Sequence, residues 1–142
     1  MIPVPRLSLV WNLAMGGFGL VFWAYAVLTI VLPGVFAPHG YILAILGALL
    51  AIFFFVTQAV AGRESAERAW DESVVHDSNR AYRFGFTVAC SVYFLFWLLV
   101  ARGWTPVEAA FPAMGALTGG SYCLFMGITG LRGWFETRNT PD

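Results

Sequence analysis

The chain has 142 residues, of which 59% are hydrophobic and only 11% are charged. A soluble domain carries about 25% charged residues, so this chain cannot cover a water-facing surface in the usual way. We therefore expect a surface that faces lipid. Eight basic and eight acidic residues cancel, which excludes a global field that would attract nucleic acid.

Four apolar stretches follow one another along the chain and predict membrane-spanning helices. They cover residues 8–32, 41–61, 81–101 and 108–131. Each has about the 20 residues that a helix needs to cross a hydrocarbon core of about 30 Å. Since each also carries Gly, Ser, Thr or Asn, we expect the helices to pack on one another. The sequence thus predicts an all-α membrane protein, with residues 1–142 forming a single four-helix antiparallel bundle.

The connections between the spans differ in length and in charge. Residues 33–40 form a short loop rich in Pro and Gly, and residues 102–104 form a shorter one. Residues 62–80 hold half of the charged residues and contain no Pro, and no Gly after Gly62. We expect this insert to be a largely helical connection between the second and third spans.

The distribution of arginine predicts the orientation, because cytoplasmic loops of membrane proteins carry an excess of basic residues. If both ends of the chain share one side, Arg102 alone lies on the other side. The remaining arginines are then on the side of the termini: Arg6, Arg63, Arg68, Arg80, Arg83, Arg132 and Arg138. We therefore expect a multi-pass protein of the bacterial inner membrane, with both termini and residues 62–80 in the cytoplasm.

Small residues recur every four positions in the last span, at Gly115, Gly119, Cys123 and Gly127. Small residues at this spacing let two helix backbones approach each other closely. We interpret the pattern as packing within one bundle. The alternative is contact with a second copy of the chain or with a larger membrane protein subunit.

Residues 63–80 are the segment in which we look first for a partner-binding surface. The candidate docking residues are charged and lie near its start: Arg63, Glu64, Glu67, Arg68, Asp71 and Glu72. A solvated helix face is the alternative, because Glu64 and Arg68 stand at the i, i+4 spacing of ordinary surface ion pairs. Glu72 and His76 share that spacing, which makes them weak candidates for holding a metal ion.

Several polar side chains within the spans are expected toward the cytoplasmic leaflet. Interhelical hydrogen bonds are the simplest explanation for them. The alternative is a cavity for a lipid or another amphipathic molecule, lined by polar and aromatic side chains: Asn12, Phe18, Phe22, Gln58, Phe84 and Phe86.

The sequence offers no set of catalytic residues. The spans carry no Asp, Glu or His at mid-depth, as a proton-coupled exporter would, and no His pair that would hold a haem. A phosphate-binding glycine motif and a Ser–His–Asp set are also missing from the sequence. Enzyme activity is therefore not supported, and we expect neither a catalytic residue nor a cofactor.

At the entry to the third span, Asp71-Glu72 is followed after eight residues by Ala81 and then by Gly85-Phe86. This arrangement resembles small bacterial membrane proteins of the uncharacterised family labelled DUF2178, in which an Asp-Glu pair precedes an Ala-rich helix entry. Ser73 stands where a basic residue commonly follows the pair. The resemblance implies a membrane protein and transfers no catalytic or ligand residue. In size, topology and first loop, the chain is also similar to the four-helix subunits of tripartite carboxylate transporters.

Three functions remain open at this point. The first is a non-enzymatic accessory or regulatory membrane protein that presents its charged cytoplasmic segment to a partner. The second is a small subunit of a transporter or channel, which would assemble with a larger membrane protein or with copies of itself. The third is a protein that binds a lipid or a quinone without turnover. Polarity that gathers near one leaflet, instead of running through all four spans, favours the first.

Overall fold

The computed structural model describes residues 4–139 and, within them, every side chain except those of residues 4, 5, 63, 65, 66, 69–78 and 137–139. The elements are α1 (Val4–Val31), α2 (Pro33–Phe36), the 3-10 helix η1 (Ala37–His39), α3 (Tyr41–Ala61), α4 (Arg63–Ala101) and α5 (Val107–Asn139). No strand occurs in residues 4–139. The prediction of an all-α chain is confirmed.

Four of the helices are long and apolar enough to cross a membrane. The spans are Arg6–Val31, Tyr41–Ala61, Asn79–Ala101 and Val107–Glu136. These bounds differ from the predicted ones by a few residues, most at the end of the last span. The prediction of four segments that are long and apolar enough to span a membrane is confirmed, and it supports a multi-pass membrane protein.

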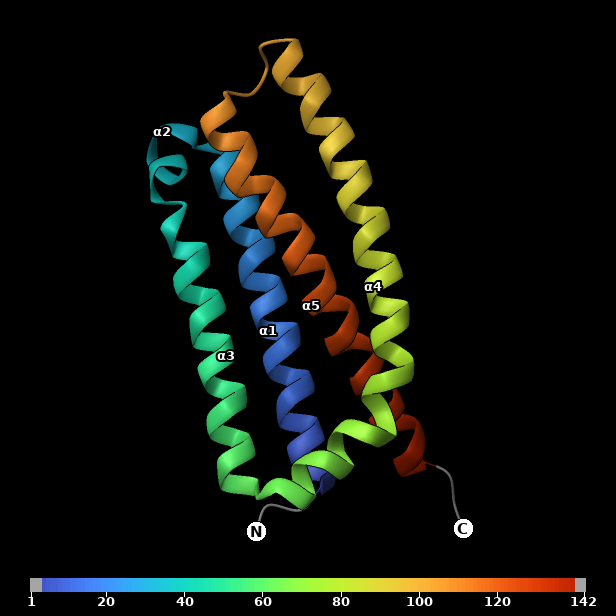
Figure 1. Cartoon of the computed structure of the whole chain (residues 1–142). Helices are drawn as coiled ribbons and strands as arrows, with labels where there is room; N and C mark the ends of the chain where they lie inside the picture. Colours follow the sequence, from blue (N-terminus) through green and yellow to red (C-terminus); the bar gives the residue numbers. More distant parts are fainter. Residues whose placement is uncertain (1–3, 140–142) are drawn as a thin grey trace.

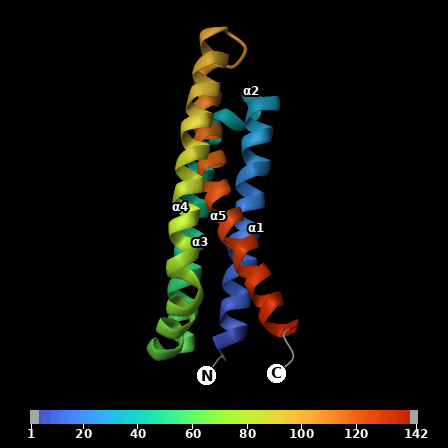
Figure 2. The same ribbon diagram turned by 90° about the vertical axis from the view of Figure 1, so that its right-hand side faces the viewer.

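The four long helices lie alongside one another, with α5 between α1 and α4 (Figure 1). The contacts between α1 and α5 are the most extensive, and those between α4 and α5 come next. α3 lies to one side and makes fewer contacts, with α1 and α4. The start of α1 and the end of α5 lie at the same end of the molecule, and α2 with η1 lies at the other end (Figures 1 and 2).

Glycines bring the backbones of α1 and α5 together. A Cβ atom placed on Gly127 would lie 2.5 Å from the backbone nitrogen of Gly16. A Cβ on Gly120 would lie 3.1 Å from the carbonyl oxygen of Gly19. No larger residue fits at these two positions of α5 without a shift of backbone, so the glycines determine how closely the two helices cross.

The predicted stripe of small residues is therefore correct for two of its four members. Cys123 and Gly127 are buried, whereas a Cβ on Gly115 or Gly119 would meet no atom within 4 Å. A spacing of four residues advances by 400° per step, so its members drift away from any one neighbouring helix. Gly120, which precedes Cys123 by three residues, takes the place of Gly119 at the contact.

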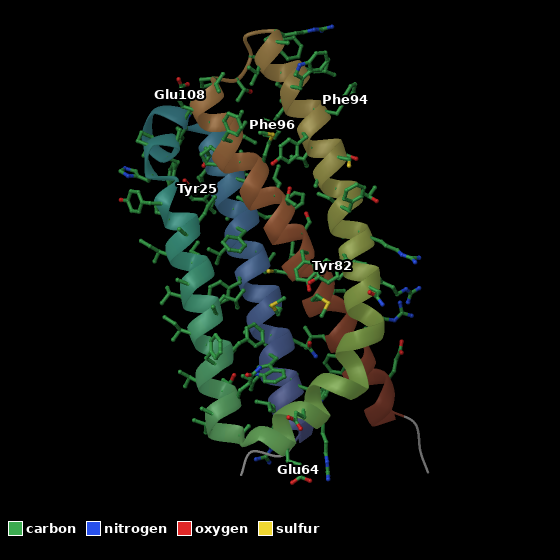
Figure 3. The ribbon with its side chains drawn as sticks, in the orientation of Figure 1. Tyr25, Glu64, Tyr82, Phe94, Phe96 and Glu108 are labelled. Carbon is green, nitrogen blue, oxygen red and sulfur yellow. The ribbon has the colours of Figure 1, made fainter. Side chains whose placement is uncertain are left out.

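The largest buried cluster fills the space between α1, α4 and α5. It includes Phe22 and Tyr25 from α1, Phe96 from α4 and Met114 from α5. Phe96 points inward from α4 in Figure 3 and is only 2% exposed. A smaller cluster joins α1 to α3 through Leu7, Trp11 and Ala61, with Phe53 and Phe54 packed against it. Aromatic side chains thus contribute to both clusters, together with small and aliphatic ones.

The charged connection is helical and continuous with the third span. α3 ends at Ala61, and α4 begins at Arg63, so one residue, Gly62, joins the two helices. Gly62 has a φ of +85°, which a residue with a Cβ rarely adopts. From there the first section of α4 lies across the end of the other helices before α4 turns to run alongside them (Figure 1). The prediction of a helical connection is confirmed.

Candidate functional site

The first section of α4 exposes its described charged side chains. Arg68 Nη2 lies 2.7 Å from Glu64 Oε1, and these side chains are 68% and 73% exposed. Glu67 is exposed as well. Glu64 lies at the end of the molecule where α1 begins (Figure 3). The expected i, i+4 pair is therefore present, but exposed pairs of this kind contribute only about 0.3–0.5 kcal/mol.

The other charged candidates fall outside the described side chains. These are Arg63, Asp71, Glu72 and His76, whose backbone belongs to α4. The docking positions at Arg63, Asp71 and Glu72, and the weak metal candidates Glu72 and His76, therefore stay predictions. Among the side chains that the structure describes, no three His, Cys, Asp or Glu residues gather as a metal site would need.

The six residues predicted to line a cavity lie in different surroundings. Phe22 is buried in the core, whereas Phe86 is 72% exposed. Asn12 packs against Gly130 of α5 and donates a hydrogen bond to Ser8. The half-buried Phe18 and Gln58 lie on α1 and α3. Of the six, Phe84 lines the pocket described next.

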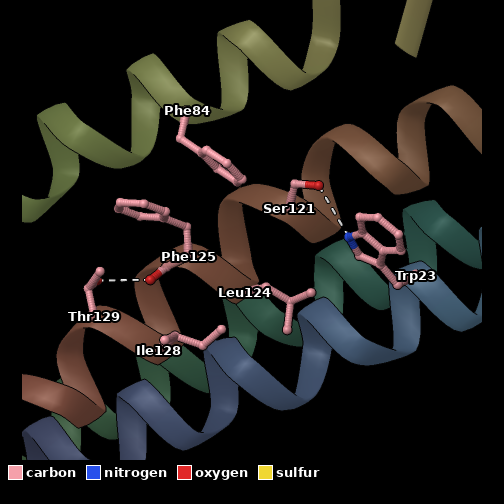
Figure 4. Close-up of a pocket in the computed structure, with 7 residues that line it drawn as sticks. All are labelled: Trp23, Phe84, Ser121, Leu124, Phe125, Ile128 and Thr129. Carbon is pink, nitrogen blue, oxygen red and sulfur yellow. Dashed lines mark hydrogen bonds between the residues drawn. The ribbon is translucent and has the colours of Figure 1, made fainter. Parts of the chain in front are cut away.

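A pocket of about 290 Å³ lies between α1, α4 and α5. We call it the Trp23–Ser121 pocket. Its lining residues, shown in Figure 4, are Trp23, Phe84, Ser121, Leu124, Phe125, Ile128 and Thr129. None of these lining residues comes from α3, which passes behind α1 and α5 in this view.

Aromatic rings and one hydrogen bond shape the Trp23–Ser121 pocket. Trp23 Nε1 donates to Ser121 Oγ at 3.2 Å. The rings of Phe84 and Phe125 stack with centroids 5.0 Å apart and planes 27° apart. The Thr129 hydroxyl donates to the carbonyl oxygen of Phe125 at 2.8 Å, within its own helix. Thr129 therefore offers its hydrogen to the backbone, while Ser121 uses its oxygen to accept.

The chemistry of this lining favours binding over catalysis. None of the seven lining side chains is ionisable near neutral pH. Acid–base catalysis and nucleophilic catalysis both need such a group within reach of the substrate. Apolar walls with very few polar atoms are typical of sites that hold an apolar molecule.

Sequence reasoning missed most of this lining. Its α5 members, from Ser121 to Thr129, recur at i, i+3, i+4, i+7 and i+8, which places them on one helix face. That spacing was available in the sequence. The sequence did not show that this face contacts Trp23, since Trp23 and Ser121 are 98 positions apart.

A second, more open pocket of about 570 Å³ lies at the other end of the molecule. It is lined by α2 and η1, which lie where the sequence predicted a loop, and by residues at and just before the start of α5: Pro33, Gly34, Ala37, Pro38, Pro106 and Glu108. Glu108 is exposed and lies at that end in Figure 3. The Glu108 carboxylate is therefore solvated, and it does not point to catalysis.

Comparisons with protein-family models, with curated proteins and with solved structures found no match for the chain. The resemblance to the DUF2178 family stays a prediction. The geometry of the charged section and of the Trp23–Ser121 pocket therefore carries the functional argument alone.

Proposed function

We propose that the chain is a non-enzymatic accessory or regulatory protein of the bacterial inner membrane, which presents residues 63–80 to a partner. In this proposal the four spans form an antiparallel bundle with both termini in the cytoplasm. The observation that carries the proposal is the position of the first section of α4. This section lies outside the span Asn79–Ala101 and exposes Glu64, Glu67 and Arg68.

The exposed charges contribute little to the stability of the protein itself. Glu64 and Arg68 pair with each other within one helix, where the interaction is screened by water. A partner can therefore contact this exposed Glu64–Arg68 pair without disturbing the core of the protein. Because both signs occur side by side, the section suits a protein surface of mixed charge better than nucleic acid or an anionic lipid surface. The partner is a larger membrane protein or a second copy of the chain.

Charge reversal tests the proposal on the full chain in native membranes. The test variant is Glu64→Arg with Arg68→Glu, which preserves the i, i+4 pair and net charge. The control is Arg102→Gln, because Arg102 is exposed at the other end of α4. After gentle detergent extraction, mass spectrometry identifies the proteins that copurify with each form.

We expect the native chain and the control to retain the same partner and the reversed variant to lose it. Rim charges of an interface act on association and specificity, so reversal of the charge order is sufficient to weaken binding. A partner retained equally by all three forms contradicts the proposal, and so does the absence of any partner from the native chain.

A further inference from the structure

We propose that the Trp23–Ser121 pocket binds a planar, carbonyl-bearing molecule dissolved in the membrane, namely a quinone ring that carries an apolar tail. The proposal goes beyond the presentation of residues 63–80 and does not depend on it. Four observations carry it, which concern the depth of the pocket, its walls, its buried hydroxyl and its size.

The first observation is the depth of the pocket. Trp23, Phe84 and Ser121 belong to three different candidate spans, and Ser121 lies near the middle of Val107–Glu136. A ligand of this site therefore enters sideways from the hydrocarbon region, which is about 30 Å thick. The ester carbonyls of a phospholipid lie near the headgroups, so they do not reach this depth. A carbonyl that meets Ser121 belongs to a molecule that dissolves whole in the hydrocarbon.

The second observation is the aromatic character of the walls. Phe84 and Phe125 stack face to face at 5.0 Å, and Trp23 lines the same pocket from α1. Aromatic faces favour offset stacking or edge contacts with another planar ring, and such pairs add about 0.5–1.5 kcal/mol beyond burial of area. A saturated acyl chain gains no such stacking energy. The walls thus favour a ring over a chain.

The third observation is the hydroxyl of Ser121, which is 3% exposed. It accepts a hydrogen bond from Trp23 Nε1, and no acceptor for its own hydrogen is found among the described residues. Five hydroxyls of the spans donate to a carbonyl of their own helix, namely Thr29, Thr57, Thr87, Ser91 and Thr129, and the Tyr25 hydroxyl donates to the carbonyl oxygen of Phe36. A buried donor without an acceptor is costly. A ligand carbonyl at this point would accept that hydrogen.

The fourth observation is the size of the pocket. A volume of about 290 Å³ lies at the lower end of the range for small-molecule sites. It suits one ring and not a whole lipid. Ile128, at 62% exposure, leaves one side of the pocket open. The tail of the ligand therefore stays in the bilayer while the ring lies between Trp23, Phe125 and Ser121.

Quenching of tryptophan fluorescence tests the proposal on the full chain in phosphatidylcholine nanodiscs. The probe is a benzoquinone with a ten-carbon tail, because quinones quench nearby indoles. The Trp23→Phe variant identifies the signal that comes from the pocket. Trp97→Phe is its matched control, since Trp97 is 64% exposed on α4. We expect saturable quenching in the native chain and in the control, and its loss in the Trp23→Phe variant.

The Ser121→Ala variant tests the role of the hydroxyl. We expect it to raise the Kd for the quinone about fivefold, which corresponds to one buried hydrogen bond of about 1 kcal/mol. Ser91→Ala is the control, because Ser91 is exposed on α4 and donates within its helix. Decylbenzene and palmitate serve as competitors for the native chain, so that the test also holds if the Ser121 variant fails to fold.

Three results would overturn the proposal. Quenching that rises linearly with the quinone would show partition into lipid without a site. Equal Kd values for the native chain and a folded Ser121→Ala variant would exclude the hydroxyl as a contact. Competition by decylbenzene at the same concentration as the quinone would show that the pocket does not need a carbonyl, and competition by palmitate at that concentration would show that it does not need a ring. Loss of partner binding by the charge-reversed variant has no bearing on these outcomes.

Discussion

α5 and α3 both run alongside α1, but they are held to it by different means. α5 meets α1 at glycines, where backbone lies against backbone, whereas α3 meets it through large side chains such as Trp11 and Phe54. In the most apolar 18-residue window of α5, 39% of the residues are buried, whereas none is buried in the corresponding window of α3. α3 is nevertheless the more apolar helix. The apolarity of a span therefore reports its fit to lipid and not its depth in the protein, since lipid tails solvate apolar side chains as well as other helices do.

The comparison between α5 and α3 predicts that the largest effect on stability occurs where glycines of α5 contact the backbone of α1. Gly127→Leu places a side chain against the backbone of Gly16, which cannot move without separating α1 from α5. We expect a loss of about 3 kcal/mol in the free energy of unfolding. Unfolding by SDS in mixed micelles, followed by circular dichroism, measures it. Gly47→Leu on α3 is the control and should change stability by less than about 0.5 kcal/mol, because nothing lies within 4 Å of that site. Equal effects of the two substitutions would break the comparison.

An intermediate effect is expected where side chains join α1 to α3. Trp11 Nε1 donates to Thr57 Oγ1 at 2.8 Å, and its ring meets Phe54 edge to face at 5.6 Å. Trp11→Phe removes the hydrogen bond and part of the packing, so we expect a loss of about 1–2 kcal/mol in the same assay. Trp97→Phe, at a lipid-exposed position, should leave stability unchanged. No difference between these variants would mean that α3 is held by something other than this contact.

The smallest effect on stability is expected at two buried threonine hydroxyls, one with a hydrogen-bond partner and one without. Thr118 Oγ1 is buried on α5 and has no hydrogen-bond partner in the described structure, whereas Thr29 Oγ1 donates to the carbonyl of Tyr25. Thr118→Val should therefore stabilise the protein by about 1 kcal/mol, because it replaces an unpaired buried hydroxyl by a methyl group of similar shape. Thr29→Val should destabilise it by about 0.6 kcal/mol. A destabilising effect of Thr118→Val would show that Thr118 has a partner, and a stabilising effect of Thr29→Val would contradict the value given to its hydrogen bond.

The sequence was sufficient to predict the four spanning helices, but not α2 and η1, which lie where a loop was expected, nor the end of α5 at Asn139. Membrane thickness requires a minimum apolar length, so the spans can be counted from composition alone. The absence of Pro and Gly after Gly62 likewise predicted a helical connection, which the structure confirms as the first section of α4. Both predictions depend only on residues that are close together in the chain.

The contacts between helices could not be predicted in the same way. Gly115 and Gly119 share the spacing of Gly127 but not its neighbour, because the face that a helix turns inward depends on where the next helix crosses it. The Trp23–Ser121 pocket depends on the same rotation, since it combines residues of three helices. Of the six residues predicted for a cavity, Phe84 alone belongs to this pocket. The composition of the spans shows that they contain aromatic residues, but it does not show which of these residues surround one pocket.

The continuity of α4 has a consequence for the charged section and the pocket. α4 has 39 residues and is about 58 Å long at 1.5 Å per residue, close to twice the hydrocarbon thickness of about 30 Å. Its first section and its span belong to one helix, and Gly62 is the one residue between that helix and α3. Phe84, in the wall of the pocket, therefore belongs to the same helix as Glu64 and Arg68. A partner bound to the charged section and a ligand held beside Phe84 would thus contact one and the same helix.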